Sequence, residues 1–374
     1  MARPDIPNLN EIIIVVKLGT STLTDGTPYL SQSRMVNLVH QMVDLLESGA
    51  KVLLVSSGAI TYGREMLEFP HLPKDIPAKQ MLAAVGQPRL MDLWGKLFAI
   101  YNQNVAQVLL TRSDLRSRSS YLNARNTLQA LLNQDVIPII NENDTVATEE
   151  IRVGDNDNLS ALVANLVDAD LLVLLTDQEG LFLDDPRKNP QAELVPLVDS
   201  LDIEPELWEA AGDSFDLGVG GMITKLQSAD LARRSGSTVV IAYGAAPDVL
   251  KRIVREEQVG TRFTPTSSAV ESRKRFILSG GTSGCITVDT GAANALARRG
   301  SLLPVGLIEV SGEFERGETL SVCREDGSEF ARGLVNYNNV DCIKLCGRQS
   351  SDIESILGYF FGDEIIHRNN LVLL

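Results

Sequence analysis

Lysine, glycine and hydroxyl residues follow two of the apolar runs in this sequence, and such residues can bind phosphate groups. Lys17 ends the first run and precedes Gly19-Thr20-Ser21, and the second run ends in Ser56-Ser57-Gly58. Backbone N–H groups in glycine-containing turns and at helix N-termini bind anions readily. Taken singly, each loop could do no more than turn the chain after a strand.

Two clusters of asparagine and aspartate lie near one another in the chain, at 141–145 and 154–158. Both residue types form turns and cap helices, so Asp157 or Asn158 could simply cap the apolar helical segment that follows. A turn needs only one or two such residues, whereas the ammonium group of a bound amino acid needs several converging acceptors. The two clusters together favour an amino-acid site.

A glycine-rich segment at 218–225, GVGGMITK, leads into another helical pattern. It is neither a Walker A loop, which needs Gly-Lys-Ser/Thr, nor a dinucleotide fingerprint, which needs a third glycine where Ile223 stands. It still offers phosphates a glycine-rich turn, a helix N-terminus and Lys225. Thr176 and Asp177, at the end of a further apolar run, could form a rim for the adenosine half of a nucleotide.

Short runs of Ile, Val and Leu alternate with segments of helical periodicity up to about residue 245, which is typical of βαβ units. We expect strands at 12–17, 51–56, 105–111, 136–140, 171–176 and 238–243. A helix between the first two has Ser31 or Ser33 as its N-cap and Gly49 beyond its end. The pattern predicts an α/β fold, an open and mainly parallel sheet sandwiched by helices, with ligands at the carboxyl ends of the strands.

The composition changes after about Gly260, where 264–275 is polar and contains Pro and Ser. We predict a catalytic domain over 1–268, a linker over 269–283, a second domain over 284–362 and a C-terminal tail over 363–374. Short β-rich stretches at 285–288, 307–310, 319–323 and 330–337, with one helix near 292–299, predict that the second domain is small, mostly β and barrel-like.

Length, charge and cysteine usage limit the possible functions. The 374 residues exceed the size at which one core stops growing, and the net charge of −15 disfavours binding to nucleic acid or anionic membrane. The apolar run at 12–16 is too short for a signal sequence or a membrane span. The four cysteines show no metal-binding spacing, and we expect Cys342 and Cys346 to be small apolar residues rather than ligands or a disulfide. These features predict a cytoplasmic protein.

The motifs together resemble the bacterial glutamate 5-kinases of the amino-acid kinase superfamily over nearly the whole chain. The resemblance rests on 17–21, 56–60, 82–87, 122–125, 141–144, 154–161, 175–178 and 220–225. Residues 286–289, 302–306 and 356–359 are similar to the PUA domain that many bacterial members carry. Residue 219 departs from the family pattern, because it is valine where threonine is more usual. The departure changes little, since backbone groups do most of the phosphate binding in such a loop.

The resemblance implies a role for each motif. Lys17 and Lys225 would contact the transferring phosphoryl group, and Asp157 would orient these two catalytic lysines. Glutamate would be held by Ser57, Asp144 and Asn156. ATP would be bound by Lys17, Thr176, Asp177, Val219, Gly220, Gly221, Met222, Ile223, Thr224 and Lys225.

The resemblance also implies Mg²⁺ accompanying ATP, although no residue is indicated as its ligand. It implies feedback inhibition by proline, through the loop that carries 142–144, and a homo-oligomer, either a dimer or a tetramer. Because the acyl phosphate product is labile, we hypothesise a transient association with the downstream glutamyl-phosphate reductase.

The chemistry of the expected reaction agrees with the residues present. A carboxylate nucleophile with a pKa near ~4.3 is already ionised at neutral pH and needs no general base. Consistently, His40, His71 and His367 all lie outside the motifs.

Two alternatives remain open. One is a related kinase acting on aspartate, N-acetylglutamate or a nucleoside monophosphate; the acceptor clusters argue for a free ammonium group, which leaves aspartate possible. The other is RNA binding through the PUA-like domain. Residues 273–354 contain ten Arg and Lys against eleven Asp and Glu, and therefore form no basic stripe.

Overall fold

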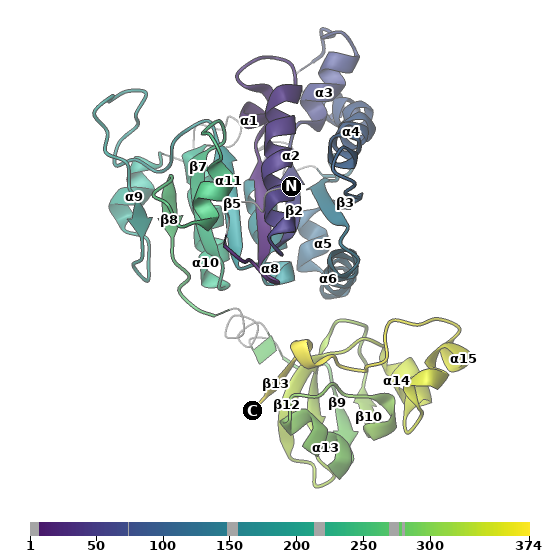
Figure 1. Cartoon of the computed structure of the whole chain (residues 1–374). Helices are drawn as coiled ribbons and strands as arrows, with labels where there is room; N and C mark the ends of the chain where they lie inside the picture. Colours follow the sequence, from purple (N-terminus) through teal and green to yellow (C-terminus); the bar gives the residue numbers. More distant parts are fainter. Residues whose placement is uncertain (1–6, 74, 148–155, 213–220, 269–276, 279–280) are drawn as a thin grey trace. The chain divides into compact units, whose positions relative to one another are not determined.

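The computed structural model describes residues 7–73, 75–147, 156–212, 221–268, 277–278 and 281–374 (Figure 1). The chain divides into two compact units. Met1–Arg112 and Arg125–Ala269 form the N-terminal unit, and Ser113–Ala124 and Val270–Leu374 form the C-terminal unit. The division after Ala269 lies next to the boundary predicted at 268, whereas the grouping of 113–124 with the C-terminal unit has no counterpart in the prediction.

An eight-stranded sheet, in the order β3-β4-β2-β1-β5-β7-β8-β6, forms the centre of the N-terminal unit. β1 pairs in parallel with β2 and β5, so that Val16 lies opposite Leu54 and Val173, and only β8 runs antiparallel to its neighbour β7. The strands are β1 (Ile13–Leu18), β2 (Lys51–Ser56), β3 (Val105–Leu110), β4 (Ile137–Glu142), β5 (Leu171–Thr176), β6 (Leu197–Val198), β7 (Thr238–Tyr243) and β8 (Thr261–Phe263).

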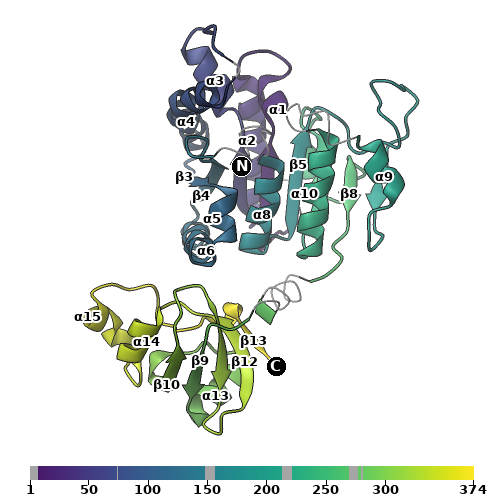
Figure 2. The same ribbon diagram turned by 180° about the vertical axis from the view of Figure 1, so that it is seen from behind.

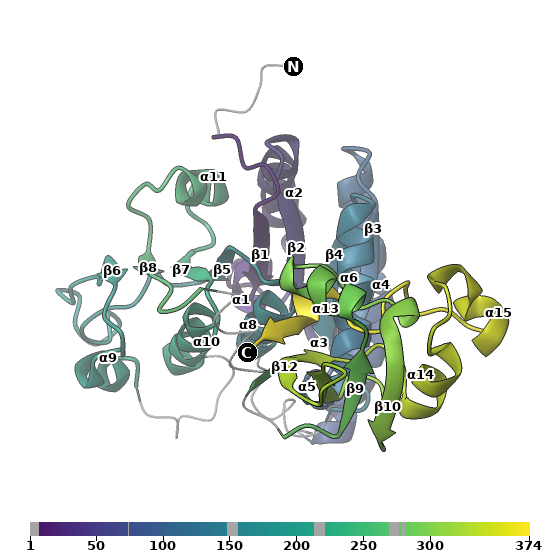
Figure 3. The same cartoon turned by 90° about the horizontal axis from the view of Figure 1, so that it is seen from below.

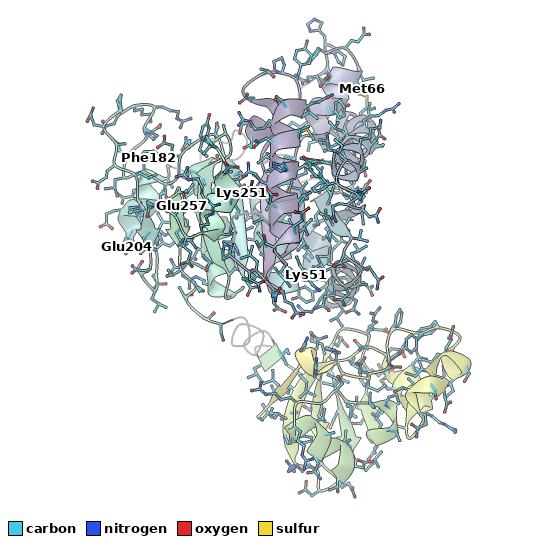
Figure 4. All side chains as sticks on the ribbon, viewed as in Figure 1. Lys51, Met66, Phe182, Glu204, Lys251 and Glu257 are labelled. Atoms are coloured by element: carbon cyan, nitrogen blue, oxygen red, sulfur yellow. The ribbon has the colours of Figure 1, made fainter. Side chains whose placement is uncertain are left out.

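Helices cover both faces of this sheet (Figures 2 and 3). α2 (Gln32–Glu47) and α11 (Val249–Val254) lie on one face, and α8 (Asn156–Val167) and α10 (Met222–Arg234) lie on the other. Ser31 caps α2 as expected, since its side chain accepts a hydrogen bond from the backbone N–H of Arg34. Lys251, labelled in Figure 4, joins α11 to α2 through an ion pair with Asp44, with 2.5 Å between Nζ and Oδ2.

Two helices at one side of the sheet approach each other unusually closely. These are α3 (Ala59–Met66) and α4 (Ile76–Ala99). A Cβ added to Gly86 would lie 1.9 Å from the backbone oxygen of Ala59, and one added to Gly63 would lie 1.9 Å from that of Leu82. No side chain fits between the two backbones at these positions. The glycines therefore allow α4 to pack directly against α3.

The remaining helices of the chain up to residue 254 are short or lie at the edges. They are α1 (Thr20–Thr24), α5 (Arg112–Arg116), α6 (Arg118–Asn133) and α9 (Pro205–Ala210). None of the helices within the described ranges is both long and apolar enough to cross a membrane.

The C-terminal unit has its own five-stranded sheet, in the order β10-β9-β11-β12-β13. The strands are β9 (Gly284–Val288), β10 (Leu307–Gly312), β11 (Thr319–Cys323), β12 (Glu329–Leu334) and β13 (Leu371–Leu373). The helices are α13 (Thr290–Ala297), α14 (Asn339–Leu345) and α15 (Ile353–Leu357). The buried side chains of Ile286, Leu320 and Tyr337 belong to a separate apolar core in this unit.

The six strands predicted for the catalytic domain and the four β stretches of the second domain are all present within a few residues of the expected bounds. The prediction missed β6, β8, α14 and α15. The final residues, expected to form a tail, contribute β13, which pairs antiparallel with β12. The α/β fold with a second, mostly β domain is therefore confirmed.

The close approach at Gly86 can be tested by substitution. Gly86→Ala is expected to lower the free energy of unfolding by about 2 kcal/mol, because α4 must move away from α3. Gly95→Ala on the same helix is the matched control, since its added Cβ would meet only Val105 Cγ2, at 3.8 Å. The control should be neutral or stabilise by up to about 1 kcal/mol.

Urea titration followed by tryptophan fluorescence measures both variants, because Trp94 and Trp208 both lie in the N-terminal unit. Equal stabilities for the two variants would show that the contact between α3 and α4 does not exclude a methyl group.

Candidate active site

The predicted catalytic residues come from three elements that meet at one edge of the sheet. Lys17 lies near the carboxyl end of β1, opposite Val55 of β2 and Leu174 of β5. Asp157 lies in the first turn of α8, and Lys225 lies in the first turn of α10. The parallel sheet brings these elements together because helices that follow parallel strands begin at the strands' carboxyl ends.

Asp157 forms ion pairs with both lysines. One carboxylate oxygen, Oδ1, contacts Lys17 Nζ, and the other, Oδ2, lies 3.2 Å from Lys225 Nζ. The three residues are buried, with exposures of 5% for Lys17, 1% for Asp157 and 6% for Lys225. The structure thus brings together the three residues predicted to be catalytic.

The ionised form of Asp157 is strongly favoured. Burial would raise the pKa of this carboxyl, but the charges of Lys17 and Lys225 and hydrogen bonds from Lys17 and Thr224 outweigh burial and lower the pKa to about 2. Asp157 is therefore an anion at any pH at which the protein would work. A carboxylate with so low a pKa cannot serve as a proton acceptor, and here it is paired with two cations.

Thr224 links the glycine-rich segment to this ion cluster. Its hydroxyl Oγ1 lies 2.9 Å from Asp157 Oδ2 and 2.8 Å from the backbone oxygen of Gly221, the N-cap of α10. Sequence reasoning placed Thr224 among the ATP-binding residues but missed its contact with Asp157. The N-terminus of α10, where backbone N–H groups lack helical partners, is thereby held beside Asp157 of α8.

Side-chain amides form a second group beside the ion cluster. Asn156, the residue before Asp157, donates from Nδ2 to Ser57 Oγ and to Asn141 Oδ1, both at 2.9 Å. Ser57 and Asn156, two of the three predicted glutamate-binding residues, are thus hydrogen-bonded to each other. Asn141 was quoted as part of a motif but was not assigned a role, since nothing in the sequence shows that it reaches Asn156.

Asp144, the third predicted glutamate-binding residue, lies in the turn after β4 and is partly buried. No hydrogen bond joins it to Ser57 or Asn156, all three of which the structure describes. Burial raises the pKa of Asp144 to about 6. Burial destabilises the ionised form of this carboxyl, and an ammonium group bound beside it would stabilise that form again.

The predicted ATP-binding residues are only partly described. Thr176 ends β5 and donates from Oγ1 to Asp177 Oδ1 at 3.0 Å. Gly221 caps α10, and Met222 and Ile223 are partly buried in its first turn. Val219 and Gly220 lie outside the described residues, as do Gly154 and Asp155 of the second polar cluster.

No resident metal site is evident among the described side chains, where no group of three or more His, Cys, Asp or Glu residues could hold an ion. A Mg²⁺ ion that arrives on ATP needs no such group, because phosphate oxygens and water provide most of its ligands.

Comparison with known proteins gives matches to both units of the chain. The sequence matches the amino acid kinase family over residues 13–243 and the PUA domain over residues 284–357. Glutamate 5-kinase from Shewanella sediminis is 53% identical over 98% of this chain and 100% of its own length, and that from Vibrio parahaemolyticus is 53% identical over 96% of each. The chain belongs to the glutamate 5-kinase family.

The glutamate 5-kinase relatives extend over both units, so the family match includes the PUA domain as well as the kinase domain. A solved structure of UMP kinase from Bacillus anthracis is 17% identical, with a TM-score of 0.47, and the match covers 69% of this chain and 98% of that chain.

The sequence matches to the glutamate 5-kinases confirm the resemblance that was expected.

Removal of the shared carboxylate tests the ion cluster. Asp157→Asn is expected to lower the free energy of unfolding at pH 7 by about 3 kcal/mol, because two buried ammonium groups lose their counter-charge. The control is Asp92→Asn, which breaks an exposed pair with Lys96, with 2.6 Å between Oδ2 and Nζ, and should cost less than about 1 kcal/mol.

The same fluorescence-detected urea titration gives both values. A loss at Asp157 no larger than that at Asp92 would mean that the lysines do not depend on this carboxylate.

Proposed function

We propose that the protein transfers the γ-phosphoryl group of ATP to the γ-carboxylate of L-glutamate, giving L-glutamyl 5-phosphate in the first step of proline synthesis. The observation that carries the proposal is the adjacency of two groups on α8. Asp157 holds two lysines, and the preceding Asn156 belongs to an amide cluster suited to an amino acid. The residue that pairs with the lysines, Asp157, and a residue of the amide cluster, Asn156, are thus neighbours in the chain.

Phosphoryl transfer needs positioning and charge neutralisation more than covalent chemistry. In this proposal Lys17 and Lys225 contact oxygens of the transferring group, and Asp157 keeps their ammonium groups in place. An oxygen of the glutamate carboxylate attacks the γ-phosphorus, the bond from that phosphorus to the β-phosphate oxygen breaks, and ADP leaves. The carboxylate is ionised beforehand, so no side chain has to remove a proton.

Glutamate would be bound by groups that complement its charged main-chain end. Asp144 and Asn156 provide acceptors for the ammonium group, and the Ser57 hydroxyl is fixed by its hydrogen bond from Asn156. ATP would enter with Mg²⁺ on its phosphates. The first turn of α10, from Met222 to Lys225, would bind the phosphates, and Thr176 and Asp177 would border the adenosine.

The resemblance to glutamate 5-kinases supports two further elements of the proposal: feedback inhibition by proline at a site overlapping that of glutamate, and assembly into a dimer or tetramer. A third, transient association with glutamyl-phosphate reductase, is supported by the lability of the acyl phosphate product. A cytoplasmic location, where ATP is abundant, belongs to the same proposal.

The function is tested by trapping the acyl phosphate with hydroxylamine in the presence of ATP and Mg²⁺. L-Glutamate, N-acetylglutamate and L-aspartate are compared, and L-proline is added to the active reaction. We expect hydroxamate from L-glutamate only, suppressed by proline. Turnover of another acid in place of glutamate would overturn the substrate assignment, and no turnover with any acid would overturn the kinase assignment.

A substitution at Lys225 separates catalysis from binding. Lys225→Ala is expected to reduce kcat by about a hundredfold or more while KM for ATP changes less than about threefold, because the lysine's contact strengthens in the transition state. Lys96→Ala is the control, since Lys96 forms an exposed pair on α4. Steady-state kinetics with varied ATP measure both; equal losses in kcat and ATP affinity would contradict the role of Lys225.

The raised pKa of Asp144 gives a pH dependence. Below its pKa of about 6 the carboxyl becomes protonated and ceases to attract an ammonium group. KM for glutamate at saturating MgATP should therefore be flat above pH 7 and rise as pH falls to 5, by at most about tenfold per pH unit.

Asp144→Asn provides the control for this titration. Its KM for glutamate should be high and nearly independent of pH over the same range. A wild-type profile parallel to that of the variant would assign the pH dependence to another group.

A further inference from the structure

The amide cluster extends beyond the predicted glutamate site to a residue on α4. Asn141 Nδ2 donates to Gln87 Oε1 at 2.8 Å, and Asn141 Oδ1 accepts from Asn156 Nδ2 and from the backbone N–H of Glu142, both at 2.9 Å. Gln87, Asn141 and Asn156 are all buried, with exposures below a tenth. A continuous chain of hydrogen bonds thus runs from α4 through β4 to the start of α8.

One backbone group determines how every amide in this chain is oriented. A backbone N–H can only donate, so the Asn141 atom that faces Glu142 N must be the oxygen. Asn141 then turns its NH₂ group to Gln87, which must present oxygen. Asn156 must in turn present its NH₂ group to Asn141 Oδ1, so each amide fixes the next.

This orientation leaves two buried polar atoms without partners among the described residues. They are Asn156 Oδ1, an acceptor, and Gln87 Nε2, a donor. A buried polar atom without a hydrogen bond costs about 1–3 kcal/mol, and native structures contain few of them. Asn156 directly precedes Asp157 of the ion cluster, and the ammonium group of a bound amino acid would satisfy its Oδ1.

The position of Gln87 on α4 is itself fixed. The neighbouring Gly86 allows α4 to contact the backbone of Ala59. On the same helix, Gln80 Nε2 donates to the backbone oxygen of Ala147 at 3.1 Å, and Trp94 Nε1 donates to Ser56 Oγ at 3.0 Å. The helix therefore holds Gln87 against β4 by contacts on both sides of it.

We propose that Gln87 is a positioning residue that sets the specificity for a free α-ammonium group. Through Oε1 it holds Asn141, and Asn141 holds Asn156 so that Oδ1 keeps no partner among the described residues and can accept from the ammonium group. Gln87 acts through these two residues and does not itself need to touch the substrate. The inference rests on the proposed function, because it concerns how the glutamate site recognises its substrate.

The test compares L-glutamate with glutarate, which has both carboxylates and lacks the α-amino group. The ratio of kcat/KM for the two acids measures recognition of the ammonium group, with hydroxamate formation as the assay. Gln87→Met keeps the size of the side chain and removes its hydrogen bonds, so the ratio should fall about tenfold. KM for MgATP should stay within about threefold of the wild-type value, because no ATP contact is altered.

Two further variants keep the test decisive. Gln87→Glu retains an oxygen for Asn141 and should preserve the ratio to within about threefold. Gln87→Asn shortens the side chain so that it no longer reaches Asn141, and it should behave as Gln87→Met does, even if the methionine variant fails to fold. The fluorescence-detected urea midpoint identifies any variant that is unfolded.

The outcomes separate this inference from the function on which it rests. A purely structural role would lower kcat/KM equally for both acids, and an unchanged ratio in Gln87→Met and Gln87→Asn would overturn the inference alone. A fall of about tenfold in the glutamate-to-glutarate ratio of kcat/KM in Gln87→Glu would also overturn the inference. The oxygen that this variant retains would then not be what positions Asn141. Failure of the wild-type protein to phosphorylate glutamate would overturn both.

Discussion

The buried carboxylate of Asp157 between two lysines is the interaction on which the arrangement of this site depends. It joins β1, α8 and α10, three elements that are far apart in the sequence. Removing an ionised group from water is expensive, and the cost is recovered only when opposite charges and hydrogen bonds surround it. The lysines and Thr224 provide these partners, and the lowered pKa of Asp157 is the result.

The same cluster explains how an acidic protein can bind anions. The chain carries a net charge of −15, which repels phosphates and carboxylates at long range. Lys17 and Lys225 place two ammonium groups beside Asp157 in a buried position, where screening by solvent is weak. In the proposed function these two lysines contact the transferring phosphoryl group, although the chain as a whole is acidic.

The features that the sequence predicts well are those that local patterns determine. Buried parallel strands appear as continuous apolar runs, so β1, β2 and β5 were found almost to the residue. The roles of Lys17, Asp157 and Lys225 were predicted from the resemblance to glutamate 5-kinases, and the structure brings these three residues together. β8 was missed because a strand of three residues has no distinctive pattern, and the role of Gln87 was missed because its hydrogen bond to Asn141 spans 54 residues of sequence. Contacts of this kind depend on how α4 packs, which no local pattern shows.

The central claim is that a glutamate carboxylate oxygen attacks the γ-phosphorus of ATP at this lysine cluster. The most direct measurement uses L-glutamate labelled with ¹⁸O in its γ-carboxylate, with the product trapped by hydroxylamine. Hydroxylamine attacks the acyl carbon, so the phosphate released should carry one ¹⁸O atom from glutamate. Unlabelled phosphate would show that ATP was hydrolysed by water, and it would contradict the account.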